Sequence, residues 1–164
     1  MTLELHQNKI LELMKELELL MATIYQQMAQ RFPDHADSYQ SLANEEMEHA
    51  GWIEQLQTAC QSGQARFAEG KTRTYTVNNM ISYLKDFLQK LEAGHLNRLQ
   101  TMTVVADFEN SLIERNVFQR FSGDTPEVAQ TLELLEQVQR QHTTRINALL
   151  LQVRNDHISQ QQGP

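Results

Sequence analysis

Hydrophobic residues recur at steps of three and four along the first part of the chain, which is the pattern of an amphipathic helix. The stripe over residues 3–31 comprises Ile10, Leu13, Met14, Leu17, Leu20, Met21, Ile24 and Met28. The segment FPDHAD interrupts this pattern: Pro33 ends the helix, and Asp34 or Asp37 can cap the next one. We therefore predict one helix over residues 3–31 and a second over residues 36–61.

The rest of the chain predicts a linker followed by three further helices. Residues 61–76 (QSGQARFAEGKTRTYT) have no clear hydrophobic period and contain two glycines, so we expect a linker. A shorter helix is expected over residues 77–92, with a break at Gly94. A long helix over about 96–121 should end at SGDTP, and the last helix should span about 126–155. We predict no strand.

These elements predict an all-α fold. The turns between the first two long helices and between the last two are short, and short turns produce antiparallel neighbours. The long middle connection can return the chain across the bundle, as in ferritin-like folds. We predict a single ferritin-like four-helix bundle over residues 1–158, with one long crossover that carries the short extra helix, and a frayed tail over residues 159–164.

Composition and charge limit the possible partners. The net charge of −7 argues against a general nucleic-acid binder. No segment approaches the roughly 18–20 apolar residues that a membrane-spanning helix needs, and the N-terminal segment lacks the features of a signal peptide. We therefore expect a cytoplasmic protein without a membrane partner. The single cysteine, Cys60, excludes an intramolecular disulfide and any CxxC metal or redox pair.

Polar residues occupy several positions where helical spacing predicts the core. They are Glu18, Glu46, His49, Glu109, Gln139 and His142. Buried carboxylates need partners or a metal, because burying an unpaired charge is costly. Positions 18 and 49 are equidistant from the break near Pro33, and positions 109 and 142 are equidistant from the break near Pro126. In antiparallel helix pairs, Glu18 should therefore face His49, and Glu109 should face His142.

This set of residues predicts a metal site in the bundle core. Carboxylates can bridge two cations, and each imidazole can supply one neutral ligand. A Glu from each of two helices, with Glu-x-x-His from each of the other two, is the pattern of di-iron and di-manganese carboxylate proteins. A single Glu-x-x-His is weak evidence, but six positions in helical register are stronger. For His142, a core histidine hydrogen-bonded to Glu109 is the alternative.

Three segments resemble the metal-binding helices of rubrerythrins: ELLMATIY (18–25), NEEMEH (44–49) and VADFENSLIERN (105–116). The resemblance covers roughly residues 8–155. It implies that Glu18, Glu46, His49, Glu109 and His142 stand at ligand positions. It also implies di-iron chemistry on oxygen or peroxide. We therefore expect iron as the cofactor, at a di-iron or a single partly occupied site, with manganese or zinc as alternatives.

The chain departs from the rubrerythrin pattern at three places. Gln139 replaces the acid of the fourth-helix motif. Asn116 stands seven residues after Glu109, where a tyrosine would correspond to Tyr25, which stands seven residues after Glu18. The cysteines of a rubredoxin-type domain are absent. An enzyme of this kind would need a separate electron donor. Because an amide is neutral and a poor bridge, we expect weaker or asymmetric metal binding, with one ion favoured near Glu18, Glu46 and His49.

Nearby acids offer a further alternative. Glu136 lies one turn before Gln139 and can substitute for the missing acid, although a solvated helix acid is the simpler interpretation. Glu45 and Glu48 are expected to face water beside Glu46.

Three functions fit the sequence. The leading hypothesis is a rubrerythrin-like metal-binding protein that handles peroxide, oxygen or iron, with any peroxidase or oxidoreductase activity weakened by Gln139. The alternative is a metal-free ferritin-like scaffold or regulatory module, in which the polar cluster forms a hydrogen-bonded network. Iron storage is less favoured, since it requires a large assembly. We expect a homodimer, as bundles of this kind often pair.

Overall fold

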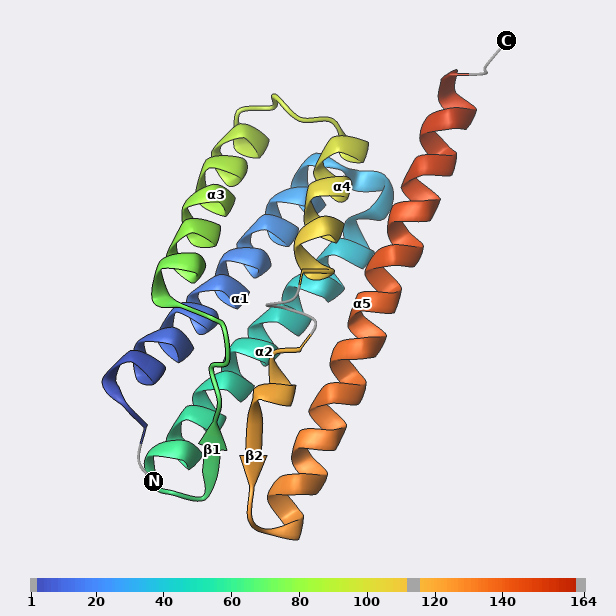
Figure 1. Cartoon of the computed structure of the whole chain (residues 1–164). Coiled ribbons are helices and arrows are strands. Elements are labelled where there is room, and N and C mark those ends of the chain that lie inside the picture. The colour runs from blue at the N-terminus through green and yellow to red at the C-terminus, as the bar shows by residue number, and fades with distance from the viewer. Residues whose placement is uncertain (1–2, 112–115, 162–164) are drawn as a thin grey trace.

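The computed structural model describes residues 3–111 and 116–161, and most of these residues are helical (Figure 1). The helices are α1 (Leu5–Arg31), α2 (Ala36–Gln61), α3 (Thr74–Glu92), α4 (Arg98–Glu109) and α5 (Pro126–Gln161). Two short strands, β1 (Ala65–Phe67) and β2 (Phe121–Gly123), form a small antiparallel ribbon. The architecture agrees with the all-α prediction.

Helices α1 and α2 form an antiparallel hairpin at the place that the sequence predicts (Figure 1). The turn is a short 3-10 helix, Pro33–His35, with Pro33 at its first position, where the missing N–H of proline costs nothing. Helix α1 packs along α2 on one side and against α3 on another, whereas α4 packs on α5. Buried residues of all five helices share one hydrophobic cluster.

The predicted helix over residues 96–121 is wrong in its extent, and so is the prediction of no strand. Helix α4 ends at Glu109, and β2 pairs with β1 so that Phe67 lies opposite Phe121. The Asn110 side chain donates hydrogen bonds to the Ala106 carbonyl oxygen and to Oδ1 of Asn147. The bond to Asn147 connects the end of α4 to α5, and the Phe67 and Phe121 rings, whose centroids lie 5.0 Å apart, pack within the ribbon. Residues 112–115 of the predicted helix lie outside the described residues.

The lengths of two other helices also differ from the prediction. Helix α3 begins at Thr74 and has 19 residues, so the crossover helix is longer than α4, which has 12. The buried face of α3 packs in the same hydrophobic cluster as α1 and consists of Val77, Ile81, Leu84, Phe87 and Leu91. Helix α5 continues to Gln161, so residues 159–161, which we expected to be frayed, are helical. Residues 162–164 lie outside the described part.

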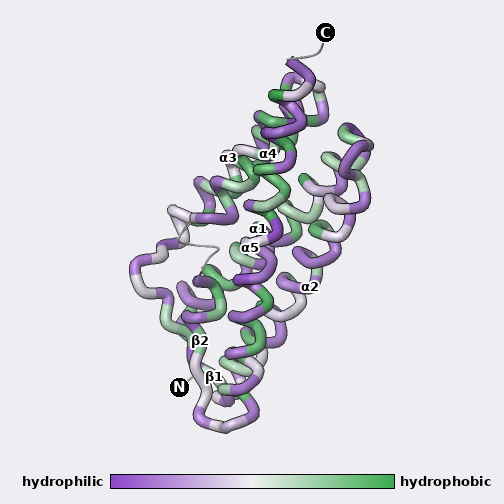
Figure 2. Tube along the Cα trace, turned by 90° about the vertical axis from the view of Figure 1, so that its right-hand side faces the viewer, coloured by the Kyte–Doolittle hydropathy of each residue, from purple (hydrophilic) through white to green (hydrophobic). Residues whose placement is uncertain are grey.

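Two hydrophobic clusters form the core, one toward each end of the bundle. Along each long helix hydrophobic positions recur among hydrophilic ones, as expected when one face is buried (Figure 2). On α1, Met14 belongs to one cluster and Met21 to the other. On α5, Leu135 belongs to the same cluster as Met14, and Ile146 belongs to the same cluster as Met21. The six predicted polar residues fall at the boundary between these clusters, near the middle of the bundle. Within the described residues, no helix is both long and apolar enough to cross a membrane.

Candidate metal centre

All six predicted site residues are buried, and four helices contribute them. The exposed fraction of each residue is between 0 and 3%. Helix α1 supplies Glu18, α2 supplies Glu46 and His49, α4 supplies Glu109 at its last position, and α5 supplies Gln139 and His142. Both predicted facing pairs are present: Nδ1 of His49 lies 3.7 Å from Oε2 of Glu18, and Nε2 of His142 lies 3.6 Å from Oε2 of Glu109. Whether these residues bind metal stays a prediction.

Glu46 lies between the two histidines. Its Oε2 accepts a hydrogen bond from Nδ1 of His49 at 3.2 Å, and its Oε1 lies 2.7 Å from Nε2 of His142. The centroids of the two imidazole rings are 4.9 Å apart. One ligand atom from each of Glu46, His49 and His142 lies within 4.8 Å of the other two, a spacing that can accommodate a metal ion. The sequence favoured Glu18 as the third member of this group, whereas the structure brings His142 there from α5.

Several buried atoms of this cluster have no hydrogen-bond partner among the described residues. They are both carboxylate oxygens of Glu18, Oε1 of Glu46, Nε2 of His49, Nε2 of His142, and both side-chain amide atoms of Gln139. Although Nε2 of His142 is close to Oε1 of Glu46, the direction of this contact does not fit a hydrogen bond. A buried polar atom without a partner is costly. A cation among these oxygen and nitrogen atoms would remove part of that cost, so the residues present fit a metal ion.

The ionisation of the cluster follows from burial and close charges. Burial raises the pKa of Glu18 to about 7, even though the nearby His49 imidazole acts in the opposite direction. Burial alone would lower the pKa of His49, but Glu18 and Glu46 outweigh it and raise this pKa to about 10. Burial likewise opposes protonation of His142, and Glu46 and Glu109 still hold its pKa well above the ordinary value. Without metal, the imidazoles therefore carry protons that a cation must displace.

Tyr25 contacts the cluster from α1. Its hydroxyl donates a hydrogen bond of 2.9 Å to Oε1 of Glu109, and the tyrosine is fully buried. Burial and the negative charge of Glu109 raise the pKa of Tyr25 well above its ordinary value, so the phenol keeps its proton. This bond leaves the other oxygen of Glu109 directed toward His142.

Glu136 and Glu45, two acids near the cluster for which the sequence predicts contact with water, differ in their environments. Glu136 is partly exposed and forms an ion pair of 3.6 Å with the exposed Arg140, which favours the interpretation as a solvated helix acid. Glu45, in contrast, does not simply face water. Its Oε2 lies 2.7 Å from Nδ1 of His142, and its Oε1 pairs with Arg145. The sequence signal that was missed is Arg145 itself, a cation placed one turn after His142.

The aromatic residues Trp52 and Phe118 close one side of the cluster. The ring of Trp52 lies 5.2 Å from that of His49, and the ring of Phe118 lies 6.2 Å from it. Phe118 begins the 3-10 helix Phe118–Arg120, and its side chain is buried. The Nε2 atom of His49 is buried and has no hydrogen-bond partner among the described residues.

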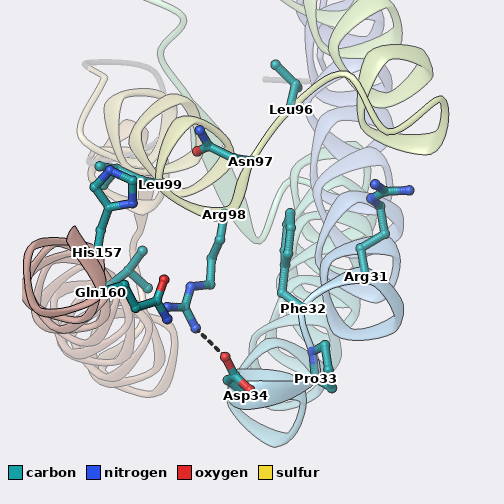
Figure 3. A pocket seen from close by; sticks show the side chains of 11 residues that line it. Arg31, Phe32, Pro33, Asp34, Leu96, Asn97, Arg98, Leu99, His157 and Gln160 are labelled. Atoms are coloured by element: carbon teal, nitrogen blue, oxygen red, sulfur yellow. Dashed lines mark hydrogen bonds and ion pairs between the residues drawn. The ribbon is translucent and has the colours of Figure 1, made fainter. Parts of the chain in front are cut away.

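A surface pocket of about 430 Å³ lies at another part of the bundle, where the α1–α2 turn, the start of α4 and the end of α5 meet (Figure 3). Nη1 of Arg98 donates to Oδ2 of Asp34 at 2.9 Å, and Nη2 lies 3.5 Å from Oδ2 of Asp156. The Arg98 charge in this pocket is therefore already neutralised. None of the lining residues belongs to the buried cluster.

Comparisons of the chain with protein-family models, with curated proteins and with solved structures find no match. The resemblance of three segments to rubrerythrins therefore stays a prediction. Function is inferred from the side-chain geometry of the cluster.

Proposed function

We propose that the chain is a metal-binding protein of the ferritin-like, rubrerythrin-like kind. Glu46, His49 and His142 hold one divalent transition-metal ion, and Glu18 and Glu109 lie beside it. The observation that carries this proposal is the convergence of Glu46, His49 and His142 in a buried place where several carboxylate and imidazole atoms lack hydrogen-bond partners. Two imidazoles with carboxylates suit iron, manganese or zinc better than calcium or magnesium, which prefer sites made of oxygen alone.

The charges of the cluster favour one ion over two. Glu18, Glu46 and Glu109 bring three negative charges when ionised, which exceed the charge of one divalent cation and fall short of that of two. Gln139 supplies no charge, and it stands where the rubrerythrin pattern has an acid. We therefore infer one tightly held ion that links the α1–α2 hairpin to α5. A second ion would bind more weakly.

If the ion is iron, it supplies the redox chemistry with peroxide or oxygen that the rubrerythrin resemblance implies, with electrons from a separate donor. The residues of this chain hold and shield the site. Tyr25 keeps its proton and orients Glu109 through a hydrogen bond. Trp52 and Phe118 exclude water beside His49, which preserves the strength of the charge interactions inside.

The direct test is metal loading followed by elemental analysis. The protein is purified without chelator, incubated separately with Fe²⁺, Mn²⁺ and Zn²⁺, and dialysed, and we expect about one tightly bound ion per chain. Substitution of Glu46 by Gln (E46Q) removes the ligand shared by both histidines. We expect it to weaken binding by more than the roughly 10–100-fold that loss of an outer-shell partner costs.

Glu136→Gln is the matched control, because Glu136 is an acid that pairs with Arg140 outside the cluster. We expect this variant to bind metal as the wild type does. Loss of metal in E136Q would make Glu136 a ligand and refute the proposed ligand set. If iron is bound, addition of peroxide to the loaded protein tests for turnover.

A metal-free scaffold is the second candidate, and specific contacts favour it. Glu46 accepts from His49, Glu45 contacts His142, and Glu109 accepts from Tyr25, so part of the cluster is already paired within the protein. A wild-type protein that retains none of the three metals, and whose thermal unfolding is unchanged by them, would support the scaffold and refute the metal site.

A further inference from the structure

The two histidines of the candidate metal centre differ in how their outer nitrogens are held. His142 directs Nε2 toward Glu46 and Glu109, and its Nδ1 lies 2.7 Å from Oε2 of Glu45. His49 directs Nδ1 toward Glu46, and its Nε2 has no hydrogen-bond partner among the described residues. Only His142 therefore has a carboxylate on the side away from the cluster.

Glu45 is itself held in place by two other side chains. Its second oxygen pairs with Arg145, which lies on α5 three residues after His142. Arg145 also donates to the Ser41 hydroxyl at 3.2 Å, and that hydroxyl donates to Glu45 at 3.4 Å. These contacts join α2 to α5 at the height of the metal centre. They fix the Glu45 carboxylate, although its side chain is 22% exposed.

A carboxylate in this position selects one tautomer of the imidazole. When His142 is neutral, the hydrogen bond to Glu45 places the remaining proton on Nδ1, and Nε2 then has a free electron pair that points into the cluster. The negative charge of Glu45 also makes Nε2 a stronger electron donor. Both effects favour binding of a cation at Nε2.

We propose that Glu45 is a positioning residue for metal binding, which acts through His142 by orienting its ring and keeping the Nδ1 proton. This inference rests on the proposed function and deepens it. It makes the α5 histidine the firmly held ligand and leaves His49, on α2, without such support. The sequence predicts neither the positioning role of Glu45 nor the firmer hold on His142, because Glu45 lies next to Glu46 and was expected to face water.

The test is Co²⁺ binding, measured by competition with a chromophoric chelator, in the wild type and three variants. Glu45→Ala removes the acceptor and the charge, and we expect it to weaken Co²⁺ binding about 10–100-fold. Glu45→Gln keeps an oxygen that can accept from Nδ1 but removes the charge, so its loss should be smaller. Glu48→Ala removes the same charge from an exposed position on the same helix, and it should change affinity by about twofold or less.

The visible absorption of bound Co²⁺ separates positioning from a structural effect. If Glu45 orients His142, E45A should change the shape of the ligand-field spectrum, E45Q should retain it, and far-UV circular dichroism should show all variants folded. Equal losses in E45A and E48A, or no loss in either, would overturn the inference while leaving the metal site in place. A wild type that binds no Co²⁺ would instead overturn the proposed function and, with it, this inference.

Discussion

Substitution of Gln139 by Glu is the most informative change to the cluster, because it introduces the acid that the rubrerythrin resemblance leads us to expect at this position. Gln139 is 3% exposed, and neither of its amide atoms has a hydrogen-bond partner among the described residues. The two side chains have nearly the same shape, so the variant changes charge without opening a cavity. It should have opposite effects on the metal-free and metal-loaded protein.

The size of the metal-free effect can be estimated from Glu18, which is buried in the same cluster. Its pKa is about 7 instead of 4.5, a difference equivalent to about 3 kcal/mol. An acid whose pKa is raised by folding costs no stability below its unfolded pKa, and the full cost is present above its folded pKa. At pH 8 without metal, Q139E should therefore lower the free energy of unfolding by about 3 kcal/mol. The melting temperature should fall by roughly 6–12 °C.

Metal should reverse this loss in the variant. A fourth carboxylate balances the charge of two divalent cations, so we expect metal uptake to rise from about one ion per chain toward two. A ligand at 100 times its dissociation constant adds about 2.7 kcal/mol to stability, which is close to the estimated loss. The assay is calorimetric unfolding at pH 8, with chelator and with Mn²⁺ or Zn²⁺, together with elemental analysis.

Gln137→Glu is the matched control, since Gln137 is exposed on the same helix two residues earlier. It should change neither metal uptake nor, by more than about 0.5 kcal/mol, stability. The reasoning would be refuted if Q139E and Q137E had the same metal-free stability, because Gln139 would then not face the acidic cluster. Unchanged metal uptake in Q139E would show that the amide does not limit binding.

Three further predictions follow from the same contacts. Metal affinity should rise with pH through about 7, as Glu18 beside the ion becomes negatively charged, and toward about 10, because His49 must lose a proton to bind. Titration calorimetry in buffers of different ionisation enthalpy would detect the protons released. Tyr25→Phe leaves a buried oxygen of Glu109 without its donor and should lower metal-free stability by about 1–3 kcal/mol in urea unfolding. Phe121→Ala removes a buried ring from the β1–β2 ribbon and should cost about 3–4 kcal/mol in the same assay.

Each of these predictions has an outcome that would contradict it. Metal affinity independent of pH would mean that the cation does not displace protons from the cluster. For the tyrosine, the control is Tyr83→Phe on the exposed face of α3, and equal effects of the two variants would argue against the bond to Glu109. For the ribbon, a loss below about 1 kcal/mol would indicate that Phe121 does not pack in the core.

The sequence alone determined the helical class and the composition of the polar cluster. Both depend on local physics: the hydrophobic period specifies which face of each helix is buried, and Pro33 specifies where the first hairpin turns. Polar residues that interrupt an apolar stripe are visible in the sequence without a structure. Glu18, Glu109 and Gln139 were found in this way, and all three are buried.

The tertiary structure decided where α4 ends and which groups meet inside. Helix α4 ends at Glu109, the next residue Asn110 bonds to Asn147, and β2 pairs with β1; both contacts join distant parts of the sequence. The position of Glu45 similarly depends on how α2 and α5 pack, since His142 and Arg145, two of its partners, lie about 100 residues away. A helical period shows which face is buried, but only the packing of helices determines which side chains touch.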